Sequence, residues 1–280
     1  MKAIISSIPP QVVEIENKSI IPTAIKIKTT FAPLLRYDQL TLNNSHQKIM
    51  GYGATGIVTE VGILRSPKLM NQHVLFLNPR GTFQEYNISS IPPYCLPIPE
   101  HVSDQEAAAL IGGADIAMVL LKKIQKTDFD QIIILGANSI VSLALMQLIN
   151  QNTDLKILPR VRDHAKSFLI TFADANNIKF DQKPSSKPLV IDTANQGYLD
   201  EINFYLSKNI DVWSVSRNDI LGASFISQPL LPSGYQFLLG ELAAGRLSIP
   251  IDKIFQFYNI NHALTYLSSP ARGRTLIQFS

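Results

Sequence analysis

The segment Gln131-Ile-Ile-Ile-Leu135-Gly136-Ala-Asn-Ser139-Ile-Val-Ser142 joins a continuous apolar strand to an apolar-faced helix through a turn with one glycine. Parallel α/β folds place phosphate-binding turns at such a junction, because glycine allows a tight turn and close approach of the backbone to the phosphate. Ser139 and Ser142 stand where further glycines are usual, so a purely structural turn is an equally good interpretation of these letters. The free N–H groups and the dipole of the helix N-terminus still suit an anion.

Strands and helices alternate from this segment onward. Apolar runs predict strands at 131–135, 155–158, 178–180, 189–191 and 212–215, and helical periodicity predicts helices at 139–150, 163–176 and 198–206. We expect Asp163 to cap the second of these helices. Alternation at this spacing is typical of a parallel, doubly wound sheet, so we predict an α/β fold for this part of the chain.

The first hundred residues are rich in β-strand patterns instead. We expect strands at 2–6, 12–16, 24–30, 72–77 and 83–88, and one more, bracketed by glycines, within 51–62. Prolines between residues 92 and 99 then indicate an extended connector. Proline has no N–H group to donate to a neighbouring strand, and it disfavours the helical conformation of the residue before it. Ser103 and Glu106 have the spacing of a capping box and open a helix that runs to Leu110. Near the C-terminus we expect helices at 236–244 and 260–267 and a closing strand at 275–279.

Composition excludes several classes of function. The chain has 280 residues, 46% hydrophobic and 17% charged, and a net charge of +3 with the basic residues scattered, which argues against nucleic acid binding. Cys95 is the only cysteine, so the sequence has no intrachain disulfide and no zinc site with two or more thiolates. Apolar runs are far shorter than the roughly 20 residues of a membrane span. We expect a soluble, cytoplasmic protein with no membrane partner.

Three basic residues follow the second strand of the alternating region: Arg160, Arg162 and Lys166. At this place in a dinucleotide fold, an acidic side chain binds the ribose hydroxyls, whereas a basic one accepts a 2′-phosphate. An ordinary solvated loop explains the same residues about equally well in isolation. Within the predicted order of strands and helices, the basic cluster favours NADP over NAD.

Five segments, taken together in their order, resemble the zinc-free, quinone oxidoreductase-like branch of the medium-chain dehydrogenase/reductase superfamily. They are Gly51–Gly62, Gly81–Tyr86, Leu96–Leu110, Gly245–Pro250 and Ala271–Ile277. The resemblance implies a GroES-like β-barrel substrate domain over 1–108, to which 246–280 returns. It also implies a Rossmann nucleotide-binding domain with a doubly wound parallel sheet over 109–245.

The resemblance also implies the residues of a site. The positions that match zinc ligands of the zinc-dependent branch are Tyr37 and Tyr52, so we expect no metal. Without zinc, hydrogen-bond donors have to stabilise the charge on the acceptor oxygen, and Tyr52, Tyr37 and Arg36 are the candidate catalytic residues. For each tyrosine the alternative is packing with its hydroxyl at the surface. His46 and His73 are interpreted as ordinary loop and strand residues.

The expected cofactor is NADP(H), held by turns at the carboxyl ends of the parallel strands. The stretch 192–195 is implied to line it, and Asp115 stands where many relatives carry a threonine beside the nicotinamide. The candidate cofactor-binding residues are Gly136, Asn138, Ser139, Ile140, Val141, Arg160, Arg162, Thr193, Ala194, Ser214, Ser216 and Asp115.

The sequence therefore favours a zinc-independent, NADP(H)-dependent oxidoreductase that transfers hydride to a quinone, enone or carbonyl small molecule. One alternative is a catalytically degenerate member that acts as a nucleotide-binding or protein-interaction module, which the single turn glycine and Asp115 both favour. Another is an accessory reductase domain of a biosynthetic enzyme. The family implies a homodimer, and 223–227 is the expected edge strand of the parallel sheet.

Overall fold

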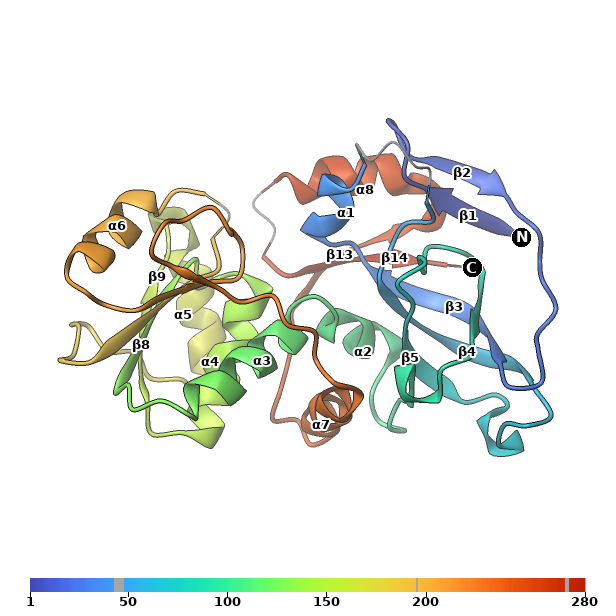
Figure 1. Ribbon diagram of the computed structural model, residues 1–280, viewed down its shortest axis with the longest axis horizontal. Helices are drawn as coiled ribbons and strands as arrows, with labels where there is room; N and C mark the ends of the chain where they lie inside the picture. The colour runs from blue at the N-terminus through green and yellow to red at the C-terminus, as the bar shows by residue number, and fades with distance from the viewer. Residues whose placement is uncertain (43–47, 195, 270–271, 280) are drawn as a thin grey trace. The chain divides into compact units, whose positions relative to one another are not determined.

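The computed structural model describes residues 1–42, 48–194, 196–269 and 272–279 (Figure 1). His46, Asn195 and Ala271, which the sequence interpretation mentions, lie outside these residues. The contacts divide the chain into unit 1, formed by Met1–Gly112 and Pro232–Ser280, and unit 2, formed by Gly113–Leu231.

The boundaries between the units differ from the expected ones at 108 and 245. The chain returns to unit 1 at Pro232, because helix α7 (Pro232–Ala243) packs against helix α2 (Asp104–Leu110) and strand β7 (Cys95–Pro97). The helix expected at 236–244 therefore belongs to unit 1 and not to the parallel-sheet domain.

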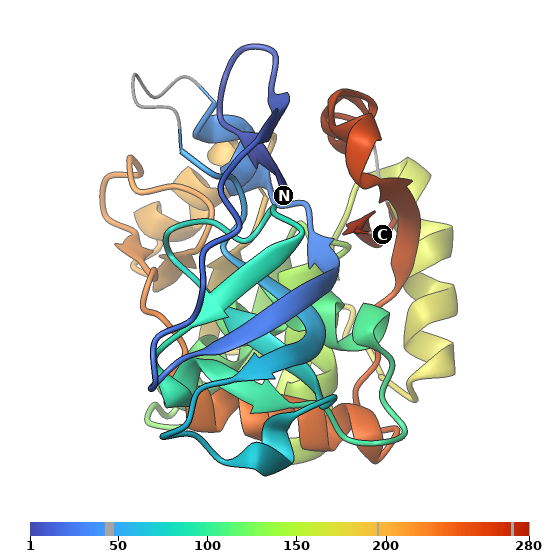
Figure 2. The same ribbon diagram turned by 90° about the vertical axis from the view of Figure 1, so that its right-hand side faces the viewer.

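Unit 1 is built on a mixed sheet. Within the described residues this sheet has seven strands, in the order β13-β14-β3-β4-β5-β7 with β6 paired to β3, and β1 and β2 form a separate antiparallel pair. The strands are β1 (Lys2–Ile5), β2 (Gln11–Glu14), β3 (Ile25–Pro33), β4 (Gly53–Val61), β5 (His73–Leu77), β6 (Tyr86–Ser89), β7, β13 (Ile251–Gln256) and β14 (Arg274–Gln278). The blue, cyan and teal strands of this sheet are seen together in Figure 2.

Phenylalanines from distant parts of the chain close the core of unit 1. The rings of Phe257 and Phe279 lie 4.9 Å apart, and those of Phe83 and Phe279 lie 6.2 Å apart. The expected capping box is confirmed, since Ser103 Oγ accepts the Glu106 N–H at 3.2 Å and the Glu106 carboxylate accepts the Ser103 N–H at 2.9 Å. The other helices of unit 1 are α1 (Arg36–Leu40) and α8 (Ile260–Leu267).

Unit 2 has the predicted parallel sheet, in which the described strands follow the order β12-β11-β10-β8-β9 and every pairing is parallel. The strands are β8 (Gln131–Leu135), β9 (Lys156–Arg160), β10 (Pro188–Asp192), β11 (Val212–Ser214) and β12 (Ser224–Phe225). The helices are α3 (Ala114–Ile124), α4 (Ile140–Asn152), α5 (Lys166–Ala175) and α6 (Leu199–Ser207). Helices α3 and α4 pack together and lie side by side in Figure 1.

Two expectations for unit 2 are wrong. No strand forms at 178–180, because the Ile178 N–H donates to Ala173 O at the end of α5, and the Asp181 N–H makes a hydrogen bond to Ile157 O of β9. Asp163 does not cap α5 and instead forms an ion pair with Lys166 at 2.8 Å. Helix α3 was not predicted, since its apolar run follows that of α2 after only two glycines.

Among the described residues, no helix combines the length and apolar character that a membrane crossing requires.

Candidate functional site

The turn after β8 needs glycine at position 136. Gly136 has φ +79°, and a Cβ added there would lie 2.9 Å from Ala194 Cβ in the turn after β10. The N–H groups of Gly136 and Ala137 donate to the Arg160 carbonyl at 3.0 and 3.1 Å, which ties the turn to the end of β9. The carboxyl ends of three neighbouring strands are thus held together at this point.

Helix α4 begins at this turn with an ordinary serine cap. Ser139 Oγ accepts the Ser142 N–H at 3.1 Å, and the Ser139 carbonyl accepts the Leu143 N–H. The next two residues, Ile140 and Val141, are half-buried, and their N–H groups have no partner among the described residues. Two backbone donors at the positive end of a helix dipole are therefore available to an anion. Asn138 lies in the same turn and is also half-buried.

Three hydroxyl groups lock the turn after β8 to the turn after β10. Thr193 Oγ1 lies 2.9 Å from Ser139 Oγ, 2.8 Å from Ser142 Oγ and 3.0 Å from the Gly136 carbonyl oxygen. These serines occupy the positions where the sequence lacks glycine. They bond to the protein itself, so the turn is rigid.

Asp192 organises the neighbouring turns from a fully buried position at the end of β10. Its carboxylate accepts the Ala194 N–H at 3.0 Å, Ser214 Oγ at 2.8 Å and Ser216 Oγ at 3.0 Å. The expected cofactor residues Thr193, Ala194, Ser214 and Ser216 are therefore brought together. The sequence interpretation missed the role of Asp192, although an acidic residue ending an apolar strand is a visible signal.

The two arginines after β9 differ in their partners. Arg160 Nε lies 3.3 Å from the Glu201 carboxylate, so its charge is partly neutralised. Arg162 is exposed and makes no hydrogen bond or ion pair with a described residue. A Cβ added to Gly197 would lie 2.7 Å from Arg162 Nη2, so glycine makes room for this guanidinium. Arg162 is the better placed of the two for an external phosphate.

Asp115 has a structural role at the start of α3. It is buried, and its Oδ1 accepts the N–H groups of Gly113 at 2.7 Å and Ile116 at 2.8 Å. These bonds hold the carboxylate against the backbone of its own helix.

The three candidate catalytic residues have different surroundings. Arg36 and Tyr37 lie on the exposed side of α1, where Arg36 Nη1 donates to Gln39 Oε1 at 2.9 Å and Tyr37 is 63% exposed. Between them and Gln39, Asp38 points inward, and its carboxylate accepts the N–H of Leu35 at 2.8 Å and of Gly51 at 3.3 Å. Burial raises the pKa of Asp38 to about 6.

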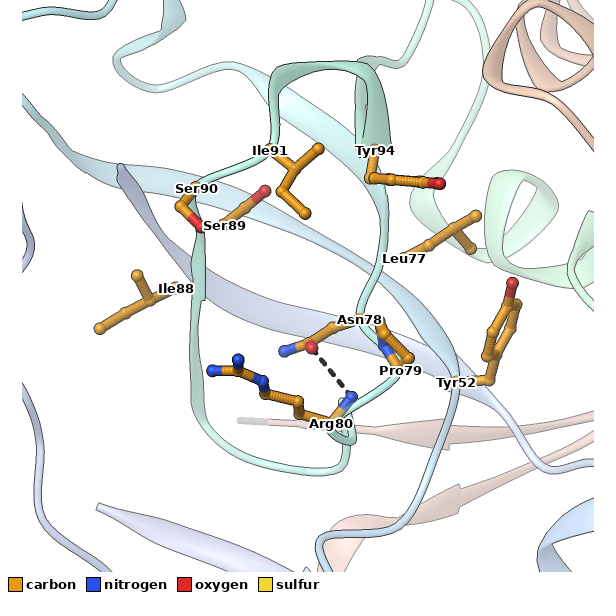
Figure 3. A pocket seen from close by; sticks show the side chains of 10 residues that line it. All are labelled: Tyr52, Leu77, Asn78, Pro79, Arg80, Ile88, Ser89, Ser90, Ile91 and Tyr94. Carbon is orange, nitrogen blue, oxygen red and sulfur yellow. Dashed lines mark hydrogen bonds between the residues drawn. The ribbon is translucent and has the colours of Figure 1, made fainter. Parts of the chain in front are cut away.

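Tyr52 lines a cavity of about 440 Å³ within unit 1. In Figure 3, Tyr52 and Tyr94 lie on one side of the view, and the Arg80 side chain extends toward Ile88 and Ser89 on the other. Arg36 and Tyr37 are not among the residues that line this cavity, which are Tyr52, Leu77, Asn78, Pro79, Arg80, Ile88, Ser89, Ser90, Ile91 and Tyr94. No role was assigned to Arg80 from the sequence, so the cavity was not foreseen.

In the described part of the chain, no three histidine, cysteine, aspartate or glutamate side chains form a group that could hold a metal ion. Cys95 is buried in β7, and burial raises the pKa of its thiol to about 12.

Comparisons with known proteins show similarity in structure only. No protein-family model matches the sequence, and no curated protein matches it either. A quinone oxidoreductase from Coxiella burnetii aligns with a TM-score of 0.81 and 18% identity, over 99% of each chain. A putative NADPH:quinone reductase from Bacillus thuringiensis has a TM-score of 0.81 and 16% identity, over 99% of this chain and 98% of that one.

A cobalt- and zinc-bound alcohol dehydrogenase from Pyrobaculum aerophilum also aligns, with a TM-score of 0.80 and 16% identity over 99% of each chain. A zinc-bound alcohol dehydrogenase and quinone reductases thus share this architecture. The chain has the α/β fold of these solved structures, in which a GroES-like, β-rich unit accompanies a Rossmann unit with a parallel sheet.

Proposed function

We propose that the protein is a zinc-independent, NADP(H)-dependent oxidoreductase that transfers hydride to a quinone, enone or carbonyl compound. The observation that carries this proposal is the donor set at the carboxyl edge of the unit 2 sheet. There, the N–H groups of Ile140 and Val141 are available at the start of α4, and Arg162 follows β9 without an ion-pair partner among the described residues.

These residues fit a dinucleotide that carries a 2′-phosphate. Ile140 and Val141 would hold the pyrophosphate through their backbone donors, and small side chains at Ser139 and Ser142 leave the approach open. Arg162 would pair with the 2′-phosphate, for which a planar guanidinium is well suited. When bound, the nicotinamide supplies the hydride.

The chain itself has to hold the acceptor and stabilise the charge that develops on its oxygen. Tyr52 is the candidate that lines a cavity, and its hydroxyl can donate a hydrogen bond to that oxygen. The zinc-free assignment rests on the sequence, since tyrosines 37 and 52 stand at the positions that match metal ligands. Tyr37 and Arg36 remain proposed contributors on the exposed side of α1.

A second function, nucleotide binding without turnover, is favoured by one observation. The N–H groups of Gly136 and Ala137 are already taken by the Arg160 carbonyl, so the turn offers fewer free donors than its backbone contains. Such a site would still hold a nucleotide through the N–H groups of Ile140 and Val141, as a sensor does.

A fluorescence titration with NADPH and, separately, NADH tests the cofactor proposal, with Trp213 of β11 as the energy-transfer donor. We expect micromolar binding of NADPH and much weaker binding of NADH. Turnover on a panel of quinones and enones would then support the reductase over the sensor. Binding of neither nucleotide would contradict both.

We also propose a homodimer that forms through the edge of the unit 2 sheet. Strand β12 is at the end of the strand order, and Phe225 on it is 45% exposed. An edge of this kind tends to be paired or covered, since its backbone groups otherwise have only water as partner.

A further inference from the structure

The cavity beside Tyr52 has the size of a small-molecule site. Its volume of about 440 Å³ lies within the range of about 300–1,000 Å³ that is usual for ligand pockets. Four segments build it: Tyr52 directly before β4, the end of β5 with the turn that follows, the end of β6 with the loop after it, and the short 3₁₀ helix Pro92–Tyr94. All of them belong to unit 1.

One part of the cavity is apolar and aromatic. Tyr52, Leu77, Ile91 and Tyr94 contribute to its lining, and Ile91 and Tyr94 are 54% and 41% exposed. Large apolar side chains that keep this much contact with water lose it when an apolar ligand covers them. The cavity therefore suits a ligand with a flat or aromatic body.

Arg80 adds a positive charge to this lining. Its guanidinium has no hydrogen bond or ion pair with a described residue, whereas its backbone N–H donates to Asn78 Oδ1 at 3.1 Å (Figure 3). The turn is further fixed at Gly81, which has φ +107° and where a Cβ would lie 2.2 Å from the Ile49 carbonyl oxygen. The backbone thus holds Arg80 in place, and its side chain is left for a ligand.

A forked guanidinium beside an apolar surface is complementary to a carboxylate on an apolar body. We infer that this cavity receives the acceptor substrate and that Arg80 selects acceptors that carry a carboxylate, an inference that rests on the proposed reductase function. Tyr52 then contacts the reacting part of the molecule and Arg80 its anionic group.

A matched pair of enones tests this selection: 3-benzoylacrylate and its methyl ester, which differ in one negative charge. In the reduction, NADPH gives a hydride to one alkene carbon and water gives a proton to the other, which yields the saturated ketone and NADP⁺. We expect kcat/KM of the wild type to be about tenfold higher for the acid than for the ester. A factor of about ten corresponds to one charge-assisted hydrogen bond from an exposed arginine. Arg80→Gln should bring the ratio near one, because kcat/KM for the acid falls much more than kcat/KM for the ester.

Two control variants separate charge recognition from other effects. Arg80→Lys should keep part of the preference, because the charge remains while the fork is lost. Lys122→Gln removes an exposed positive charge from α3 in unit 2 and should leave the ratio unchanged. A ratio that survives in Arg80→Gln, or that falls equally in Lys122→Gln, overturns the inference.

Calorimetry without cofactor keeps the cavity testable if no enone is turned over. The saturated product, 3-benzoylpropionate, should bind the wild type about tenfold more tightly than it binds Arg80→Gln. Binding of this kind without turnover supports the inferred ligand site in the cavity and contradicts the proposed reductase function. Turnover without discrimination between acid and ester supports the reductase function and overturns the role of Arg80. Absence of binding in calorimetry also overturns it.

Discussion

Arg162 and Arg160 follow the same strand, yet the structure assigns them different expected effects on cofactor affinity. Arg162 is exposed and has no ion-pair partner among the described residues, whereas Arg160 lies 3.3 Å from the Glu201 carboxylate. We therefore predict that Arg162→Ala weakens NADPH binding and leaves NADH binding unchanged, because only NADPH carries the 2′-phosphate that this guanidinium would contact.

The size of the effect follows from the exposure of Arg162. A hydrogen bond to a charged group contributes about 1.5–3 kcal/mol, and solvent screening of an exposed pair reduces this toward about 1 kcal/mol. We expect a loss of about 1.4 kcal/mol, which is a tenfold rise in Kd for NADPH. Arg160→Ala is the matched control and should raise that Kd about twofold, since Glu201 already neutralises part of its charge.

Fluorescence titration of the two variants with both nucleotides measures these changes at a fixed salt concentration, because screening alters the result. Equal weakening of NADPH and NADH in Arg162→Ala would show that the residue supports the fold rather than the phosphate. A large effect of Arg160→Ala with none for Arg162→Ala would reverse the assignment of the two arginines.

Three further predictions concern stability and assembly. Gly136→Ala should destabilise the protein in urea unfolding. The left-handed backbone contributes about 1–2 kcal/mol to this loss, and crowding against Ala194 contributes about 1–3 kcal/mol. Gly240→Ala in α7 is the control and should stabilise the protein by about 0.5–1 kcal/mol, because a Cβ at Gly240 has no neighbour within 4 Å. Burial raises the pKa of Asp38 from 3.8 to about 6, so between these pH values the folded protein binds a proton at Asp38 that the unfolded chain does not bind. The stability that this group contributes is therefore fully present below pH 4 and is lost as the pH rises through about 6. Asp38→Asn should therefore gain about 2 kcal/mol relative to the wild type between pH 4 and pH 7, and an unchanged difference would contradict the burial argument. Phe225→Lys on the edge strand should convert the proposed dimer to a monomer in light scattering, and a wild type that is already monomeric would refute that proposal.

The sequence predicted the parts of the fold that depend on local pattern. The order of β8, the Gly136 turn and α4 follows from an apolar run, a glycine and a serine cap, all within one short segment. The strand expected at 178–180 does not form, for a reason that the amino-acid sequence does not show. Its first N–H is used to end α5, after Asn177 adopts a left-handed conformation with φ 54°.

The candidate site was predicted less completely, because its central contacts join residues far apart in sequence. Asp192 bonds to Ser214 and Ser216, which are 22 and 24 residues away, and neither pattern nor spacing specifies these pairs. No sequence pattern marks Arg80, since its place in the lining of the same cavity as Tyr52 depends on the pairing of β4 with β5.

The central claim is that the start of α4 and the end of β9 bind a nicotinamide dinucleotide, and amide NMR of the ¹⁵N-labelled wild type during titration with NADPH tests it most directly. We predict that the largest shifts belong to the backbone N–H groups of Ile140 and Val141 and to the Nε–H of Arg162. Saturable binding that leaves these three signals in place, or no shift in any signal, would contradict the claim.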